Sequence, residues 1–174
     1  MKKILLLLVT FMSIVTLTSC NKTPLEKVLK DVKNNHPKTI TLSDYTNFKW
    51  DEVWLISGSI GGRYIILMRE KNIDVKKIKI PGLKYGIAQE FSNTVVYVYN
   101  NKVVYYEFPP DARDYVGLAS EGALALLDFK LERGQIIVVS SNNSVCEVKD
   151  GDLVPIKPIK IYENMDEKLK PIIN

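Results

Sequence analysis

The pattern of apolar and polar positions predicts one helix near the start of the chain, followed by a series of strands. Thr23 and Glu26 have the spacing of a capping box, and Pro24 suits the first helical position. The helix is expected to end before Pro37, because a residue preceding proline avoids helical angles. Its apolar stripe, which we expect to pack on the strands, recurs every three or four residues and consists of Leu25, Val28, Leu29 and Val32.

From residue 39 onward, short runs rich in β-branched and aromatic residues predict strands. Thr39–Leu42 and Val53–Ile56 are two such runs. A glycine-rich turn at 58–62 precedes the run 64–68, which is apolar on both faces and is expected to be a buried strand. The predicted fold class is therefore α+β, a mostly antiparallel β-sheet with the N-terminal helix packed on it.

The clearest unit is a predicted hairpin at residues 94–108, with its turn at Asn100-Asn101. This turn places Tyr99 opposite Lys102. One face would then carry Val96, Val98, Val103 and Tyr105, and the other Val95, Tyr97, Tyr99, Val104, Tyr106 and Phe108. A hairpin half exposed to water should alternate between apolar and polar residues. Either both faces are covered, or one of them is a binding face.

The remainder of the chain predicts further strands. A second hairpin is expected at 135–149 around Asn142-Asn143. Pro155 and Pro158 interrupt the extended run 153–162, which favours an edge strand. The tail after residue 162 is expected to hold one helical turn. No repeat and no second domain boundary is evident, so residues 20–174 are interpreted as a single globular domain.

Residues 1–20 have the layout of a secretory signal peptide. Lys2 and Lys3 precede a nearly uncharged apolar run over residues 4–17, which is shorter than most membrane-spanning helices. An uncleaved anchor helix is the alternative. Leu17-Thr18-Ser19-Cys20 resembles the lipobox of bacterial lipoproteins. The resemblance implies that residues 1–19 are removed as a signal peptide, that Cys20 is the lipid attachment site, and that acyl chains such as palmitate anchor the protein in a membrane.

This resemblance also implies a location in the bacterial cell envelope. Asn21 follows the lipobox cysteine, and the enterobacterial sorting rule retains a lipoprotein in the inner membrane when Asp stands there. The outer membrane is therefore favoured if the organism is Gram-negative. Loss of Lys2 and Lys3 lowers the formal net charge from +4 to +2. That charge and an exported location argue against nucleic acid as a partner, which leaves the membrane and an envelope protein or glycan.

The residue inventory excludes several kinds of chemistry. His36 is the only histidine and stands at a helix end, so a Ser or Cys nucleophile paired with a His base is not expected. Two cysteines and one histidine are too few for a zinc site, and we expect no metal and no cofactor. Cys146 lies in a strand-like run and is expected to be buried and inert. The remaining acid–base candidates are the carboxylates Asp51, Glu52, Glu90, Asp111 and Asp114.

Aromatic residues provide the candidate binding surface: Tyr97, Tyr99, Trp50 and Trp54. Tyr and Trp combine a large contact area with a polar tip, which suits binding faces and cores alike. Tyr97 and Tyr99 are expected to be partly exposed. The stretch 48–53 and the hairpin 97–108 also resemble parts of small uncharacterised envelope lipoproteins, a resemblance that implies no activity.

We therefore expect a lipid-anchored envelope protein with a non-enzymatic binding or interaction role. Two alternatives remain open at this stage. The first is an inhibitor of a cell-wall-degrading enzyme such as lysozyme, and the second is a carboxylate-dependent glycan hydrolase. A concave pair of carboxylates would favour the hydrolase, whereas an aromatic patch would favour binding.

Overall fold

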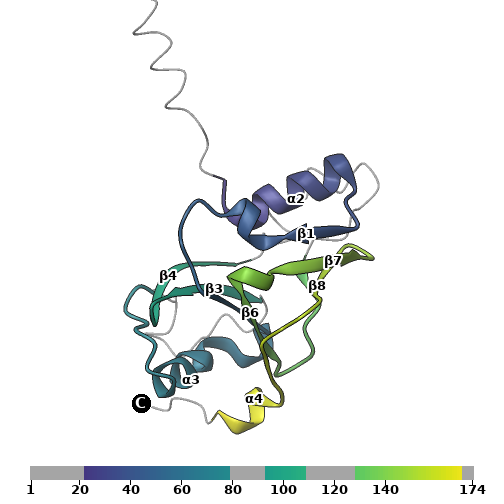
Figure 1. Ribbon diagram of the computed structural model, residues 1–174. Coiled ribbons are helices and arrows are strands. Elements are labelled where there is room, and N and C mark those ends of the chain that lie inside the picture. Colours follow the sequence, from purple (N-terminus) through teal and green to yellow (C-terminus); the bar gives the residue numbers. More distant parts are fainter. Residues whose placement is uncertain (1–21, 79–92, 109–127, 170–174) are drawn as a thin grey trace, which may run out of the picture.

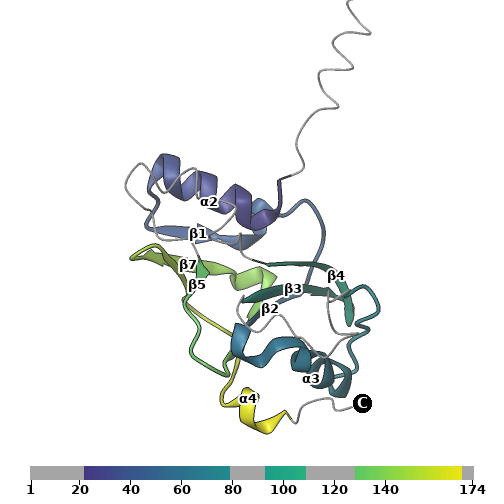
Figure 2. The ribbon, with the colours of Figure 1, turned by 180° about the vertical axis from the view of Figure 1, so that it is seen from behind.

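The computed structural model describes residues 22–78, 93–108 and 128–169, which form three layers (Figures 1 and 2). The middle layer is a five-stranded sheet of order β4-β3-β2-β6-β9 in which all neighbouring strands are antiparallel. Its strands are β2 (Glu52–Ile56), β3 (Thr94–Tyr99), β4 (Lys102–Glu107), β6 (Ile136–Ser140) and β9 (Lys160–Tyr162).

A smaller four-stranded sheet and helix α2 (Pro24–Asn35) lie above the middle layer in Figure 1. The small sheet has the order β1-β7-β8-β5, antiparallel except for the parallel pair β5–β8. Its strands are β1 (Thr39–Thr41), β7 (Val145–Lys149), β8 (Asp152–Pro155) and β5 (Asp128–Phe129). The prediction of an α+β fold, mostly antiparallel sheet with an N-terminal helix, is confirmed.

Helix α2 begins and ends as the sequence predicts. Thr23 and Glu26 form both hydrogen bonds of the capping box, and Pro24 occupies the first helical position. The helix ends at Asn35, where His36 adopts a left-handed conformation. Leu25 and Val28 are buried in the core between α2, the small sheet and the middle sheet. Burial of two such side chains contributes roughly 3–6 kcal/mol to the docking of the helix.

Both faces of the middle sheet are covered, which answers the question raised by its two apolar faces. One face packs against α2 and the small sheet. The other packs against α3 (Tyr64–Glu70) and α4 (Met165–Lys168), which lie below the sheet in Figure 1. The one-turn helix α4 confirms the helical turn expected in the tail. None of the helices among the described residues has the length and apolar character needed to cross a bilayer.

The β3–β4 hairpin turns at Asn100-Asn101 as predicted, with positive φ at both residues. Tyr99 pairs with Lys102 as expected, but the next pairs along the ladder are Val98 with Val103 and Tyr97 with Tyr105. Val104 is therefore an extra residue in a β-bulge. Beyond this bulge the side chains of β4 change faces, so Tyr105 and Tyr106 occupy the faces opposite to those predicted.

The run 64–68 is helical, so its prediction as a strand was wrong. The chain leaves β2 through the 3-10 helix η3 (Gly58–Arg63) and continues directly into α3. A short run that is buried on all sides does not distinguish a helix from a strand by its periodicity. Gly61 adopts φ 56° and ψ −150° at the kink in η3, a conformation that is essentially restricted to glycine.

The second predicted hairpin was also wrong. β6 pairs with β2 and β9 in the middle sheet, whereas β7 pairs with β1 and β8 in the small sheet. The 3-10 helix η7 (Ser141–Asn143) carries the chain from one sheet to the other. β9, which follows Pro158, is an edge strand of the middle sheet as expected. β8, which ends at Pro155, lies between β7 and β5, so the edge position predicted for this part of the run was wrong.

Candidate functional site

Two of the places where the chain crosses between the two sheets lie next to each other. The first crossing is the 3-10 helix η2 (Leu42–Tyr45), which leads from β1 toward β2. The second is η7, which leads from β6 to β7. We call the region where η2 and η7 meet the seam. Strand ends and irregular backbone gather here, and such segments carry exposed polar side chains more readily than the strands themselves.

Ser144 holds the two sides of the seam together. Its side chain is 1% exposed, and its hydroxyl accepts a hydrogen bond from the Ser43 backbone N–H at 3.2 Å. The same hydroxyl lies 3.3 Å from both the Ser43 hydroxyl and the Ser141 carbonyl oxygen, to either of which it can donate its proton. The Leu42 backbone N–H also donates to the Ser144 carbonyl oxygen at 2.9 Å. The geometry of the seam is therefore held by a set of partly buried hydrogen bonds centred on Ser144.

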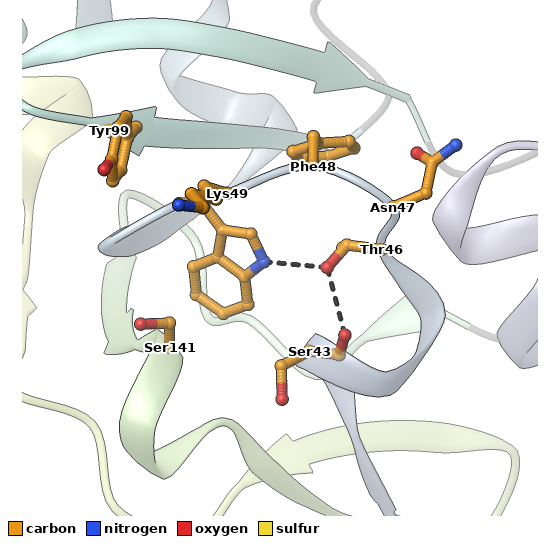
Figure 3. Close-up of a pocket in the computed structure, with 8 residues that line it drawn as sticks. Ser43, Thr46, Asn47, Phe48, Lys49, Tyr99 and Ser141 are labelled. Atoms are coloured by element: carbon orange, nitrogen blue, oxygen red, sulfur yellow. Dashed lines mark hydrogen bonds between the residues drawn. The ribbon is translucent and has the colours of Figure 1, made fainter.

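A pocket of about 450 Å³ opens at the seam (Figure 3). Phe48 and Tyr99 lie at one side of it, with Ser43 and Ser141 across from them. We call it the seam pocket. Its lining residues are Ser43, Thr46, Asn47, Phe48, Lys49, Trp50, Tyr99 and Ser141.

The aromatic side of the seam pocket is a packed cluster. The ring of Phe48 lies 5.2 Å from that of Tyr97, edge to face, and 5.1 Å from that of Tyr105. Trp50 also meets Tyr97 edge to face, at 5.5 Å. The Trp50 indole N–H donates to the Thr46 hydroxyl at 3.0 Å, and that hydroxyl donates to the Ser43 carbonyl oxygen. These contacts hold the rings in fixed orientations, so the pocket is preorganised.

The structure separates the four aromatic residues proposed as a binding surface. Trp50 and Tyr99 both line the seam pocket. Tyr99 is partly exposed, as expected. Tyr97 is only 1% exposed, so the exposure predicted for it was wrong: Phe48 and Trp50 pack on its ring. Trp54 is buried in the core on the other side of the middle sheet, stacked on Tyr162, and therefore belongs to no common surface with the other three.

Polar atoms in the seam pocket fall into two groups. The hydroxyls of Ser43 and Thr46 are used in hydrogen bonds within the protein. In contrast, the Asn47 amide, the Lys49 ammonium and the hydroxyls of Tyr99 and Ser141 make no hydrogen bond within the described part of the chain. In Figure 3, Lys49 and Tyr99 lie at one side of the pocket, and Ser141 lies across from them. These groups are available to a ligand.

No carboxylate is among the described residues that line the seam pocket, and Lys49 is the one charged residue there. The candidate pair Asp51 and Glu52 is engaged elsewhere. Asp51 accepts a hydrogen bond from the Asn100 backbone N–H at 2.7 Å, and Glu52 accepts one from the Trp54 indole at 3.0 Å. The other candidate carboxylates, Glu90, Asp111 and Asp114, lie outside the described residues. Within the described ranges no three His, Cys, Asp or Glu side chains come together to hold a metal ion.

Glu107 is a buried carboxyl group that the sequence reasoning did not select. It is 6% exposed, at the end of β4. One of its oxygens accepts a hydrogen bond from the Leu25 backbone N–H at 3.3 Å, and the other accepts one from the Tyr97 hydroxyl at 3.2 Å. Burial raises the pKa of Glu107 to about 7, against the opposing effect of hydrogen bonds from Thr23, Leu25 and Tyr97. The charge of nearby Glu26 also raises this pKa.

Glu107 joins the first turn of α2 to the β3–β4 hairpin, away from the residues that line the seam pocket. A signal for it was present in the sequence, since it is the only charged residue in the otherwise apolar run 103–108. Cys146 is fully buried as expected, and burial raises the pKa of its thiol to about 12.

Comparison of the chain with protein-family models, with curated proteins and with solved structures finds no match.

Proposed function

We propose that this chain is a lipid-anchored protein of the bacterial envelope with a non-enzymatic binding role, and that the seam pocket is its binding site. The observation that carries the proposal is the composition of the pocket. Packed aromatic rings lie beside hydroxyl, amide and ammonium groups that make no hydrogen bond with the residues that the structure describes. Binding sites commonly combine an apolar floor with a few polar groups that fix the orientation of the ligand.

The same composition favours binding over hydrolysis. A glycan hydrolase needs two carboxyl groups facing each other across the scissile bond. The described lining of the seam pocket offers no carboxyl group, and Asp51 and Glu52 are occupied by hydrogen bonds of the β2–β3 region. The membrane is a partner in this proposal through Cys20, and the outer membrane is the proposed location if the organism is Gram-negative.

Lipid attachment is tested by mass spectrometry of the protein extracted from membranes. The expected result is a chain that begins at Cys20 and carries acyl groups, whereas Cys20→Ala leaves an uncut precursor without acyl groups. An unmodified Cys20, or cleavage elsewhere with release of a soluble protein, contradicts the lipid anchor.

The binding role is tested by titrating the isotope-labelled protein with a soluble digest of cell-wall material and recording its amide NMR spectrum. We expect saturable shifts at residues of the seam pocket, which Tyr99→Ser should weaken. Lys102→Ser is the matched control, because Lys102 pairs with Tyr99 in the hairpin but does not line the pocket. Shifts that are absent from the pocket, or that the two variants weaken equally, contradict the assignment of the site.

A further inference from the structure

Glu107 is the only buried acidic residue in the part of the chain that the structure describes, and it lies between α2 and the middle sheet. From α2 it accepts a hydrogen bond from the Leu25 backbone N–H, and the side chain of Thr23 at the helix N-cap also hydrogen-bonds to it. From β3 it accepts a hydrogen bond from the Tyr97 hydroxyl. A single carboxyl group therefore joins the start of α2 to the sheet that the helix covers.

The cluster around Glu107 can hold the carboxyl group in its neutral form. Thr23 and Tyr97 contribute hydroxyl groups, which accept hydrogen bonds as well as donating them. The ionised form is less favourable here, because burial and the charge of Glu26 oppose it and raise the pKa to about 7. As the pH rises through neutrality, the contact between α2 and the sheet thus acquires a buried negative charge.

The tyrosine and cysteine side chains near Glu107 keep their protons in this range. Burial raises the pKa of Tyr97 well above 10, and it also raises the pKa of Tyr105 on β4. Cys146 approaches Tyr97 from β7, and burial raises the pKa of its thiol to about 12. Of these groups only Glu107 changes its charge near neutral pH.

Helix α2 is the element that this charge can release. Only three of its twelve residues are buried: Pro24, Leu25 and Val28. The helix precedes β1, so its departure breaks no strand pair among the described residues, whereas β2 is paired with a strand on each side. Elements with few buried contacts open locally at a lower free energy than the core does.

We propose that Glu107 makes the docking of α2 sensitive to pH. When its carboxyl group loses the proton, the first turn of α2 separates from the middle sheet more readily, while the two sheets stay folded. This inference goes beyond the binding role, because it concerns the attachment of the helix and not the seam pocket.

The test is native-state hydrogen exchange of the full-length protein in detergent, followed by NMR at each amide. Protection factors are compared, since they correct for the effect of pH on the exchange chemistry itself. We expect the amides of α2 to be less protected than those of β2. If opening returns Glu107 to its ordinary pKa of 4.5, protection in α2 falls by up to about 70-fold, and at least about tenfold, between pH 5 and pH 8.

Two variants identify the group responsible. Glu107→Gln cannot ionise but retains an oxygen that accepts from the Leu25 N–H, so protection in α2 should change by less than about threefold over the same range. His36→Asn is the matched control, because a histidine at a helix end is the other kind of group that responds to pH here. Asn tolerates the left-handed conformation of this position, and the variant should keep the full pH dependence.

The wild type also decides the matter by itself if Glu107→Gln fails to fold. The loss of protection in α2 should then share its midpoint with the titration of the Glu107 carboxyl carbon, followed by carbon-13 NMR of the same sample. Two different midpoints would show that another group controls the helix.

Several other results would overturn the inference. It fails if protection in wild-type α2 falls by less than about tenfold, if Glu107→Gln keeps the dependence, or if His36→Asn abolishes it. It also fails if α2 is as strongly protected as β2, since the helix then opens only when the whole domain unfolds. None of these results bears on the seam pocket, so the proposed binding role is judged by its own titration.

Discussion

The carboxyl group of Glu107 should make the stability of the domain depend on pH in a window where few other groups titrate. Its pKa rises from an ordinary value of 4.5 to about 7 because the side chain is buried between β4 and the first turn of α2. The folded protein therefore retains a proton that the unfolded chain has already lost. The contribution of Glu107 to stability is greatest below pH 4.5 and is lost as the pH rises through 7.

The magnitude follows from the difference between the two pKa values. Each unit of difference corresponds to about 1.4 kcal/mol, so the full effect is about 3 kcal/mol, of which about 2.5 kcal/mol falls between pH 5 and pH 8. Glu107→Gln removes the titration but keeps a side chain that can accept from the Leu25 N–H or the Tyr97 hydroxyl. The free energy of unfolding of this variant should therefore fall less between pH 5 and pH 8 than that of the wild type.

The assay is urea unfolding of wild type and variant at several pH values, with the difference in unfolding free energy plotted against pH. This difference cancels the contributions of other groups, including Asp31 and Asp166, whose lowered pKa values act only below the window. Glu147→Gln is the matched control, since Glu147 is exposed on β7. The reasoning is refuted if the difference between wild type and Glu107→Gln stays constant within about 0.5 kcal/mol from pH 5 to pH 8.

Three further predictions concern other buried groups. Ser144→Ala should lower the unfolding free energy by about 1–3 kcal/mol, because it leaves the Ser43 N–H without its buried acceptor; a loss below about 0.5 kcal/mol in urea unfolding would contradict the role of the seam. Gly134→Ala should lower the unfolding free energy by at least about 1–2 kcal/mol, since φ is +70° there and the new Cβ would clash with the Asp166 Oδ1 atom. An unchanged unfolding midpoint would argue against this geometry. In a Cys20→Ser background, Cys146 should react with a thiol reagent only as fast as the domain unfolds, because burial raises its pKa to about 12; rapid labelling in the native state would show that the thiol is accessible.

Short sequence motifs were sufficient to predict the elements whose structure depends on contacts between residues close together in the chain. The capping box of Thr23 and Glu26 set the start of α2, and Asn100-Asn101 set the hairpin turn, since each works through contacts within four residues. The predictions failed where distant packing decides the outcome. The run 64–68 is apolar on all sides whether it forms a helix or a strand. Only its packing against the middle sheet decides between the two conformations.

The candidate site was predictable only in part, for a similar reason. Trp50 and Tyr99 were found because aromatic residues with a polar tip stand out in any sequence. Four of the residues that complete the pocket, at positions 46–49, directly precede Trp50, but Ser43 of η2 and Ser141 of η7 lie about a hundred residues apart along the chain. The bulge at Val104 also has no sequence signature, yet it decides that Tyr105 rather than Tyr106 packs beside Tyr97.

The position of Ser144 has a consequence for how the domain fluctuates. Its single hydroxyl contacts both crossings, through Ser43 on one and Ser141 on the other. We expect loss of these hydrogen bonds to loosen both crossings together, so that the seam opens as one unit. Amide hydrogen exchange in η2 and η7 should therefore be coupled, and a molecule bound in the pocket should slow exchange in both segments by the same factor.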